Sequence, residues 1–258
     1  MNININLLQP LLVAVFVAGA ASLLGVFAIL KRMALVGDAL SHVALPGIAL
    51  ALIFNFNLFL GAICFLIVAT FGIWFLKYQS NLPIETIVGV FFAASLALGT
   101  LITPEQELLE ALLGNITSLT WQESIISILS SLVLVIILLW IHKKLTINMI
   151  SEEMASSIGI NNKRLDFIYL MIFALAVALG IRFVGALLMG SLVIIPAASA
   201  KNITKSLYSF MGLSVVFGIV SSAFGIYISF IYNLSPGPIF ILISSIFFVI
   251  SLLIRRLR

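Results

Sequence analysis

Apolar residues occur along this chain in long runs separated by short polar or glycine- and proline-containing breaks. Most runs are about 17–25 residues long, the length that an α-helix needs to cross a bilayer. They lack the alternation over about ten residues that is typical of an outer-membrane barrel. The pattern predicts nine membrane helices, at residues 8–30, 36–54, 58–76, 84–103, 123–141, 166–181, 184–200, 207–231 and 238–254. The sixth and seventh are short and close together, so eight helices are the alternative.

The composition agrees with a membrane protein. Of the 258 residues, 63% are hydrophobic and only 9% are charged, whereas a soluble domain carries about 25% charged residues. We therefore expect an all-α, polytopic integral membrane protein with a single transmembrane domain over residues 1–258. Lys31 and Arg32 follow the first apolar run instead of preceding it, so we interpret that run as a membrane helix and not as a signal peptide. The net charge of +4 indicates no nucleic-acid partner, because the basic residues lie where a bilayer would place them.

The basic residues also predict an orientation. If the N-terminus lies outside, 12 of the 13 lysines and arginines fall in inside loops and only Arg182 falls outside, as the positive-inside rule requires. This distribution favours nine helices, with the C-terminus in the cytoplasm. The outside loop between the fourth and fifth helices is then acidic. It is either a solvated loop or a surface that docks a partner or attracts cations, and it contains Glu105, Glu107, Glu110 and Glu123.

The longest inside loop, residues 143–165, reads "KKLTINMISEEMASSIGINNKRL". Ser151 is a typical helix N-cap, Glu152 and Glu153 suit the first turn of a helix, and Gly159 suits its end. A handful of residues would be enough to connect two membrane helices. The extra short helix therefore indicates either a docking site for a cytoplasmic partner or a connector at the membrane interface.

Asp38 and His42 are two ionisable residues within an apolar segment. Four residues apart on a helix, they lie on one face, where a carboxylate and an imidazole can bind a transition metal. Ionisable groups inside a membrane usually line a transport pathway. The alternative is structural: Asp38 caps the helix and His42 donates to a backbone carbonyl. Pro46 and Gly47 follow and predict a kink.

The chain shows no motif of an enzyme. HExxH, GxSxG and phosphate-binding sequences do not occur in it. If ATP drives this protein, we expect a separate chain to bind and hydrolyse it.

Several stretches, taken together and in order, resemble a known family. They are "KRMALVGDALSHVALPGIAL", "LPIETIVGVFFAASLALGTLI" (82–102), "ISEEMASSIGINNKRL" (150–165), "RFVGALLMGSLVIIPAASAKNITKS" (182–206) and "YNLSPGPIFILISSIFF". This set is similar to the ABC-3 permeases of bacterial zinc and manganese importers. Its sequence resembles that of the zinc permeases most. The resemblance covers nearly the whole chain.

The resemblance implies an architecture like that of type II ABC importers in the bacterial cytoplasmic membrane. It implies a homodimer of permeases, two cytoplasmic ATP-binding subunits and an extracytoplasmic metal-binding protein. No permanently bound cofactor is expected. The cargo would be a divalent metal, with zinc favoured by the imidazole and manganese or iron as alternatives. A siderophore or cobalamin permease and a secondary metal or proton transporter are the more distant rivals.

The resemblance also assigns roles to residues. Asp38 and His42 would contact the ion. A pathway and its outer gate would be lined by Pro46, Phe91, Ala94, Ser95 and Leu98. Coupling to the ATP-binding subunit would use Glu152, Glu153, Ala155 and Gly159. In one respect the chain departs from the family, because Asn233 lies near the position where many relatives carry an aspartate.

Overall fold

The computed structural model describes residues 5–102, 120–186 and 188–256. Glu105, Glu107 and Glu110 of the acidic loop lie outside these residues. The described chain is helical throughout, apart from short connections, and contains no strand. Its helices are α1 (Ile5–Leu30), α2 (Val36–Val43), α3 (Leu45–Ile53), α4 (Leu58–Gln79), α5 (Ile84–Ile102), α7 (Trp121–Ile150), α8 (Glu152–Ser157), α9 (Asn162–Val184), α10 (Met189–Ile203), α11 (Leu207–Tyr232) and α12 (Pro236–Arg256).

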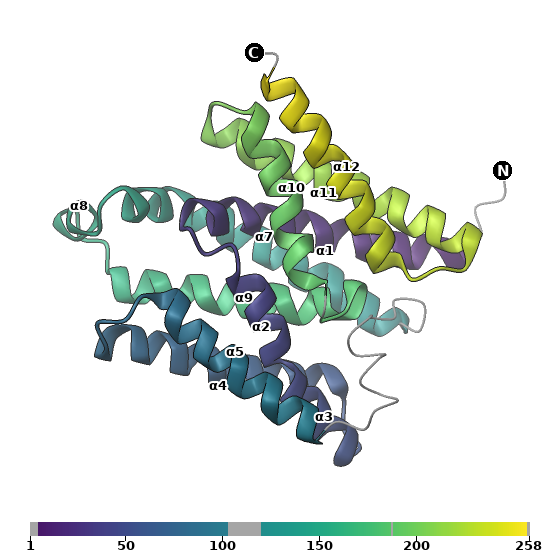
Figure 1. Ribbon diagram of the computed structural model, residues 1–258, viewed down its shortest axis with the longest axis horizontal. Coiled ribbons are helices and arrows are strands. Elements are labelled where there is room, and N and C mark those ends of the chain that lie inside the picture. Colours follow the sequence, from purple (N-terminus) through teal and green to yellow (C-terminus); the bar gives the residue numbers. More distant parts are fainter. Residues whose placement is uncertain (1–4, 103–119, 187, 257–258) are drawn as a thin grey trace.

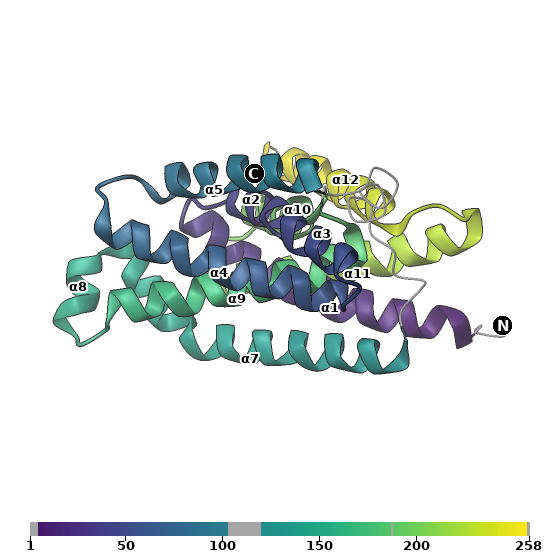
Figure 2. The ribbon, with the colours of Figure 1, turned by 90° about the horizontal axis from the view of Figure 1, so that it is seen from below.

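α1 and α9 are in contact near the middle of the molecule, and the other helices lie around them (Figure 1). Seen from the side, α7 forms one face and α5 and α12 form the opposite face, with α1, α4 and α9 between them (Figure 2). The buried core includes large side chains from both central helices, among them Phe27, Tyr169 and Phe173. The outer helices instead expose most of their apolar surface, as expected where lipid takes the place of a protein neighbour.

The predicted fold class is confirmed, and the helix count differs in one place. In the described part of the chain, eight helical segments are long and apolar enough to cross a membrane. The predicted span 184–200 corresponds to α10, which has only 15 residues. At 1.5 Å per residue it is about 22 Å long, shorter than the roughly 30 Å of the hydrocarbon core. It packs against α1, α11 and α12, so it is enclosed by protein over much of its surface.

Two predicted boundaries are wrong, and both concern the inside loop at 143–165. α7 continues through Lys143 and Lys144 to Ile150, because lysine is a good helix former and does not end a helix. α9 begins at Asn162, where the Asn161 side chain accepts a hydrogen bond from the Arg164 backbone N–H at 3.0 Å. The loop therefore contains only Ser151, α8 and residues 158–161.

The predicted kink after the Asp–His pair is confirmed. The segment 36–54 is divided at Ala44 into α2 and α3, and Pro46 lies in the first turn of α3. There its missing N–H costs no hydrogen bond. α3 then packs directly on α4, because a Cβ atom at Gly47 would clash with the carbonyl oxygen of Gly61. Only two glycines allow these backbones to approach so closely.

Candidate functional site

Asp38 lies in the first turn of α2 and does not cap it. The N-cap position is Leu35, which makes no side-chain hydrogen bond to the helix. No residue in the described ranges forms an ion pair or a side-chain hydrogen bond with the Asp38 carboxylate. The capping alternative is therefore wrong, and the half-buried carboxylate remains available to a ligand.

His42 lies one turn further along α2 and is also half-buried. Its Nδ1 atom is buried and has no hydrogen-bond partner among the described residues, so the expected bond to a backbone carbonyl does not form there. The imidazole instead packs edge-on against Phe92 of α5, with ring centroids 5.3 Å apart and an angle of 70°. Such a contact fixes the ring while leaving a nitrogen free to bind a metal.

The start of α10 and the turn before it hold α2 in place. Gly190 lies so close to α2 that a Cβ atom there would be 2.7 Å from the Cβ of Asp38. The hydroxyl of Ser41 is buried and lies 2.6 Å from the carbonyl oxygens of Ala186 and Asp38. Sequence reasoning did not select Ser41 or Gly190, because a small residue gives no signal until its neighbour in space is known.

The five predicted pathway residues lie on two different surfaces. Pro46 is buried in α3 next to Gly99 of α5, and Ser95 is buried on the same face of α5 as Gly99. A Cβ atom at Gly72 of α4 would lie 2.7 Å from the ring of Phe91, so Phe91 packs towards α4.

Ala94 and Leu98 continue the face of α5 that Phe91 begins, and both are exposed on this chain, Leu98 by 50%. Phe92, which was not predicted, is the aromatic residue of α5 that meets His42. Pro46 and Ser95 therefore lie on buried surfaces of α3 and α5, whereas Phe91, Ala94 and Leu98 lie on another face of α5.

α8 forms a separate tip of the molecule, seen at the left in Figure 1. The predicted cap is confirmed, since the Ser151 hydroxyl accepts a hydrogen bond from the Met154 backbone N–H at 3.1 Å. Gly159 adopts a φ of +83°, which favours glycine. Glu152 and Glu153 are exposed, whereas the Ala155 side chain is fully buried and packs α8 onto its own chain.

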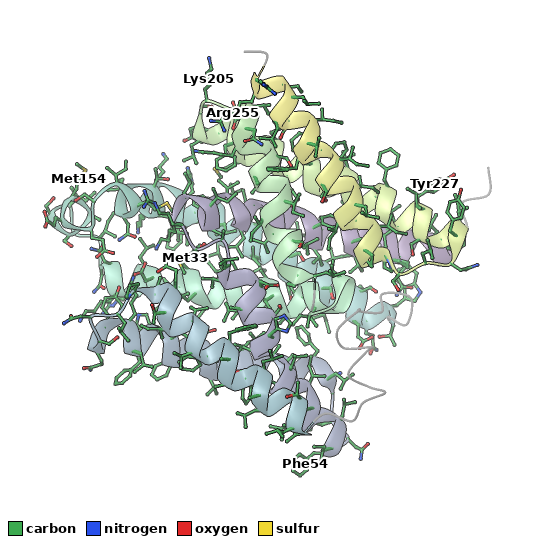
Figure 3. The ribbon with its side chains drawn as sticks, viewed as in Figure 1. Met33, Phe54, Met154, Lys205, Tyr227 and Arg255 are labelled. Carbon is green, nitrogen blue, oxygen red and sulfur yellow. The ribbon has the colours of Figure 1, made fainter. Side chains whose placement is uncertain are left out.

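Met154 points outward from this tip (Figure 3) and is 52% exposed. Ile158 at the end of α8 is 58% exposed. These two residues form an apolar surface that sequence reasoning did not select, because it followed the charged residues of the segment.

Asn233 and Glu123 have structural roles at helix ends. Asn233 ends α11 in the left-handed conformation, with φ of 52°, which asparagine adopts more readily than most residues. Glu123, assigned to the acidic loop, lies in the first turn of α7, where its carboxylate accepts a hydrogen bond from the Thr120 backbone N–H at 3.0 Å. Thr120 in turn accepts one from the Glu123 N–H, which completes a capping box.

The described chain is a bundle of apolar helices that contains a half-buried carboxylate and imidazole and has a small capped helix at one tip, an arrangement that suits a membrane permease. The sequence profile described as "ABC 3 transport family" matches residues 4–255. The chain therefore belongs to the ABC 3 transport family, and the resemblance noted in the sequence is confirmed.

Similar proteins cover nearly the whole chain. "Manganese transport system membrane protein MntC" of Listeria monocytogenes is 31% identical over 95% of this chain and 89% of its own length. "High-affinity zinc uptake system membrane protein ZnuB" of Buchnera aphidicola is 33% identical over 88% of this chain and 90% of its own. Among solved structures, "PsaBC from Streptococcus pneumoniae in complex with Fab" matches with a TM-score of 0.84 and 30% identity, over 96% of this chain and 91% of that chain.

Proposed function

We propose that this chain is the membrane-spanning subunit of an ATP-driven importer for a divalent transition metal, with zinc as its substrate. The observation that carries the proposal is the Asp38–His42 pair on α2. A carboxylate that makes no side-chain hydrogen bond or salt bridge within the described chain and an imidazole whose buried Nδ1 has no hydrogen-bond partner there lie one turn apart, within a membrane-spanning segment. Burying such groups is unfavourable unless a partner compensates them, and a passing dication is such a partner.

Two ligands also suit release. A resident structural zinc is normally held by four protein ligands, and no group of three or more histidine, cysteine or acidic residues that could hold a metal occurs among the described residues. An ion bound by Asp38 and His42 would be held weakly enough to move on, as conduction requires. Selectivity would then depend largely on a separate metal-binding protein.

Manganese is the second candidate substrate, because relatives named for manganese match as much of the chain as those named for zinc. Imidazole favours zinc, and carboxylate suits both metals. We expect cells that lack this permease to lose zinc first when each metal in turn is made limiting, and to recover it when the gene is restored. Cellular metal content, measured by mass spectrometry, distinguishes zinc from manganese as the substrate. A loss of manganese alone would identify manganese as the substrate.

The proposed partners follow from two surfaces. α8 carries exposed Met154 and Ile158 at one tip, a place suited to a cytoplasmic ATP-binding subunit. The face of α5 with Ala94 and Leu98 is not covered by the described chain, which supports contact with a second copy of the permease. The complete importer would contain two permeases, two ATP-binding subunits and one extracytoplasmic metal-binding protein.

We infer that α8 and the C-terminus lie in the cytoplasm and the N-terminus outside. Lys205 and Arg255 lie at one edge of the molecule, while Phe54 and Tyr227 lie at other edges, away from α8 (Figure 3). The positive-inside rule places the basic edge in the cytoplasm. With both termini assigned in this way, α10 completes the ninth crossing within the protein interior.

Thiol labelling tests this orientation. Cys64 is the chain's only cysteine, so Cys64→Ala provides a background without thiols. In that background we expect Phe56→Cys to react with a membrane-impermeant reagent added to intact cells, and Asn161→Cys to react only after the membrane is opened. The reverse pattern would overturn the orientation and the direction of import.

A further inference from the structure

A buried carboxylate joins three helices at the end of the bundle that carries α8. Asp166 lies near the start of α9 with its side chain only 4% exposed. Lys31, directly after α1, forms an ion pair with it at 2.6 Å, and Lys77 of α4 forms a second. The Tyr78 hydroxyl donates a hydrogen bond to the same carboxylate at 2.9 Å. Asp166 therefore fixes the ends of α1 and α4 to α9.

α9 is in turn bonded to α8. The side-chain amide of Asn162, one turn before Asp166, donates to the Glu152 carbonyl oxygen at 2.8 Å and to the Ser156 hydroxyl at 3.0 Å. Both acceptors belong to α8. A second link runs to α4, because the Trp74 indole N–H donates to the Lys163 carbonyl oxygen at 2.9 Å. A displacement of α8 thus acts directly on the first turn of α9.

Asp166 is also connected to α2, the helix of Asp38 and His42, through its partner Lys31. Only residues 31–35 separate the end of α1 from α2, and the Met33 N–H is bonded back to the Ala28 carbonyl oxygen at 2.8 Å. A short, hydrogen-bonded connection therefore joins Lys31 to the start of α2, the helix that carries Asp38 and His42. α4 reaches the same site through its close contact with α3 at Gly47 and Gly61.

An open pocket of about 370 Å³ lies beside the cluster formed by Asp166, Lys31 and Lys77. Its lining includes Lys31, Lys77 and Asp166, and also Ser151 and Glu152 at the start of α8. Its presence here allows α8 to shift relative to the helix ends that Asp166 holds together.

We propose that Asp166 is a positioning residue for transport, which passes a displacement of α8 through Lys31 and Lys77 to α2, the helix that carries Asp38 and His42, and to the adjoining α3. This inference rests on the proposed function. Two lysines from different helices on one buried carboxylate form a stiff polar connection, because the Asp166 charge, only 4% exposed, would be strongly destabilising without them. An ordinary apolar contact would allow the helices to slide more freely.

The test uses the permease purified with its ATP-binding and metal-binding partners and reconstituted in vesicles. Asp166→Asn keeps the shape of the side chain and removes its charge. We expect the variant complex to assemble and to retain basal ATP hydrolysis, while stimulation of hydrolysis by the zinc-loaded binding protein and uptake of radioactive zinc fall about fivefold or more. Glu85→Gln, an exposed acid in the first turn of α5, is the matched control and should stay within about twofold of wild type.

A purely structural role would reduce assembly, basal hydrolysis and uptake in parallel, and that result overturns the inference. Stimulation and uptake within about twofold of wild type at normal protein level also overturn it. If Asp166→Asn does not reach the membrane, Lys77→Gln decides, because it removes one of the two ion pairs and Lys77 is the more exposed of the two lysines. Reduced stimulation with normal basal hydrolysis supports the inference, and unchanged stimulation contradicts it. A wild-type complex that takes up no metal would instead overturn the proposed function itself.

Discussion

Asp38→Asn is expected to reduce metal uptake at least about tenfold, since even residues that only support a metal ligand typically contribute 10–100-fold. Asparagine keeps the shape of aspartate and is an equally good helix cap, so a capping residue would tolerate the change. Asp38 lies inside α2, however, and Leu35 holds the N-cap position. The change therefore removes mainly the negative charge that would meet the cation.

His42→Gln provides the companion variant, because it removes the imidazole and keeps a polar side chain. We expect a similar loss of uptake, measured with radioactive zinc in cells that express each variant. Glu85→Gln, which lies outside the site, should transport normally. Full uptake by Asp38→Asn, at a wild-type amount of protein in the membrane, would return the pair to a structural role.

Met154→Glu together with Ile158→Glu is expected to release the ATP-binding subunit, lowering its co-purification with the permease at least about tenfold, the loss typical of an interface hot spot. Both side chains are more than half exposed on α8, and a charge at either position would have to be buried on docking. Met154→Leu keeps the apolar surface and is the matched control. Equal recovery of the subunit with both variants would contradict a docking role for α8.

Gly159→Pro tests the turn after α8 in the same way. Proline fixes φ near −65°, whereas Gly159 requires +83°, and its N–H donates to the Ser156 carbonyl oxygen at 3.0 Å. The substitution should therefore reorient α8 while the membrane helices stay intact. We expect an assembled bundle that no longer transports. Glu152→Lys, which reverses a charge on the exposed face of α8, should also uncouple it.

The helical architecture could be predicted from the sequence because the requirements of a bilayer are simple. A long apolar run must form a helix, and lysines and arginines mark its ends. The same rules missed the end of α7, since Lys143 and Lys144 continue the helix instead of ending it. They also predicted a full membrane span for α10. This prediction failed because a short helix enclosed by protein need not match the thickness of the membrane.

The site was predictable only where its residues are neighbours in sequence. Asp38 and His42 are one helical turn apart, so periodicity alone places them together. Phe92 is fifty positions beyond His42, and neighbouring Phe91 gave an equally good signal; only the rotation of α5 decides between them. Asp166 was overlooked because the two lysines that bind it come from distant helices.

The Ser41 hydroxyl has consequences for how α2 is held. It has one hydrogen to donate, yet two carbonyl oxygens, those of Asp38 and Ala186, lie 2.6 Å away. A rotation about one bond therefore moves the hydrogen from the turn before α10 to the backbone of α2, and the donor is satisfied in both positions. If the hydroxyl turns to Asp38, the bond between the two segments opens and the buried Ser41 donor keeps a partner, so that only the Ala186 carbonyl oxygen loses this bond.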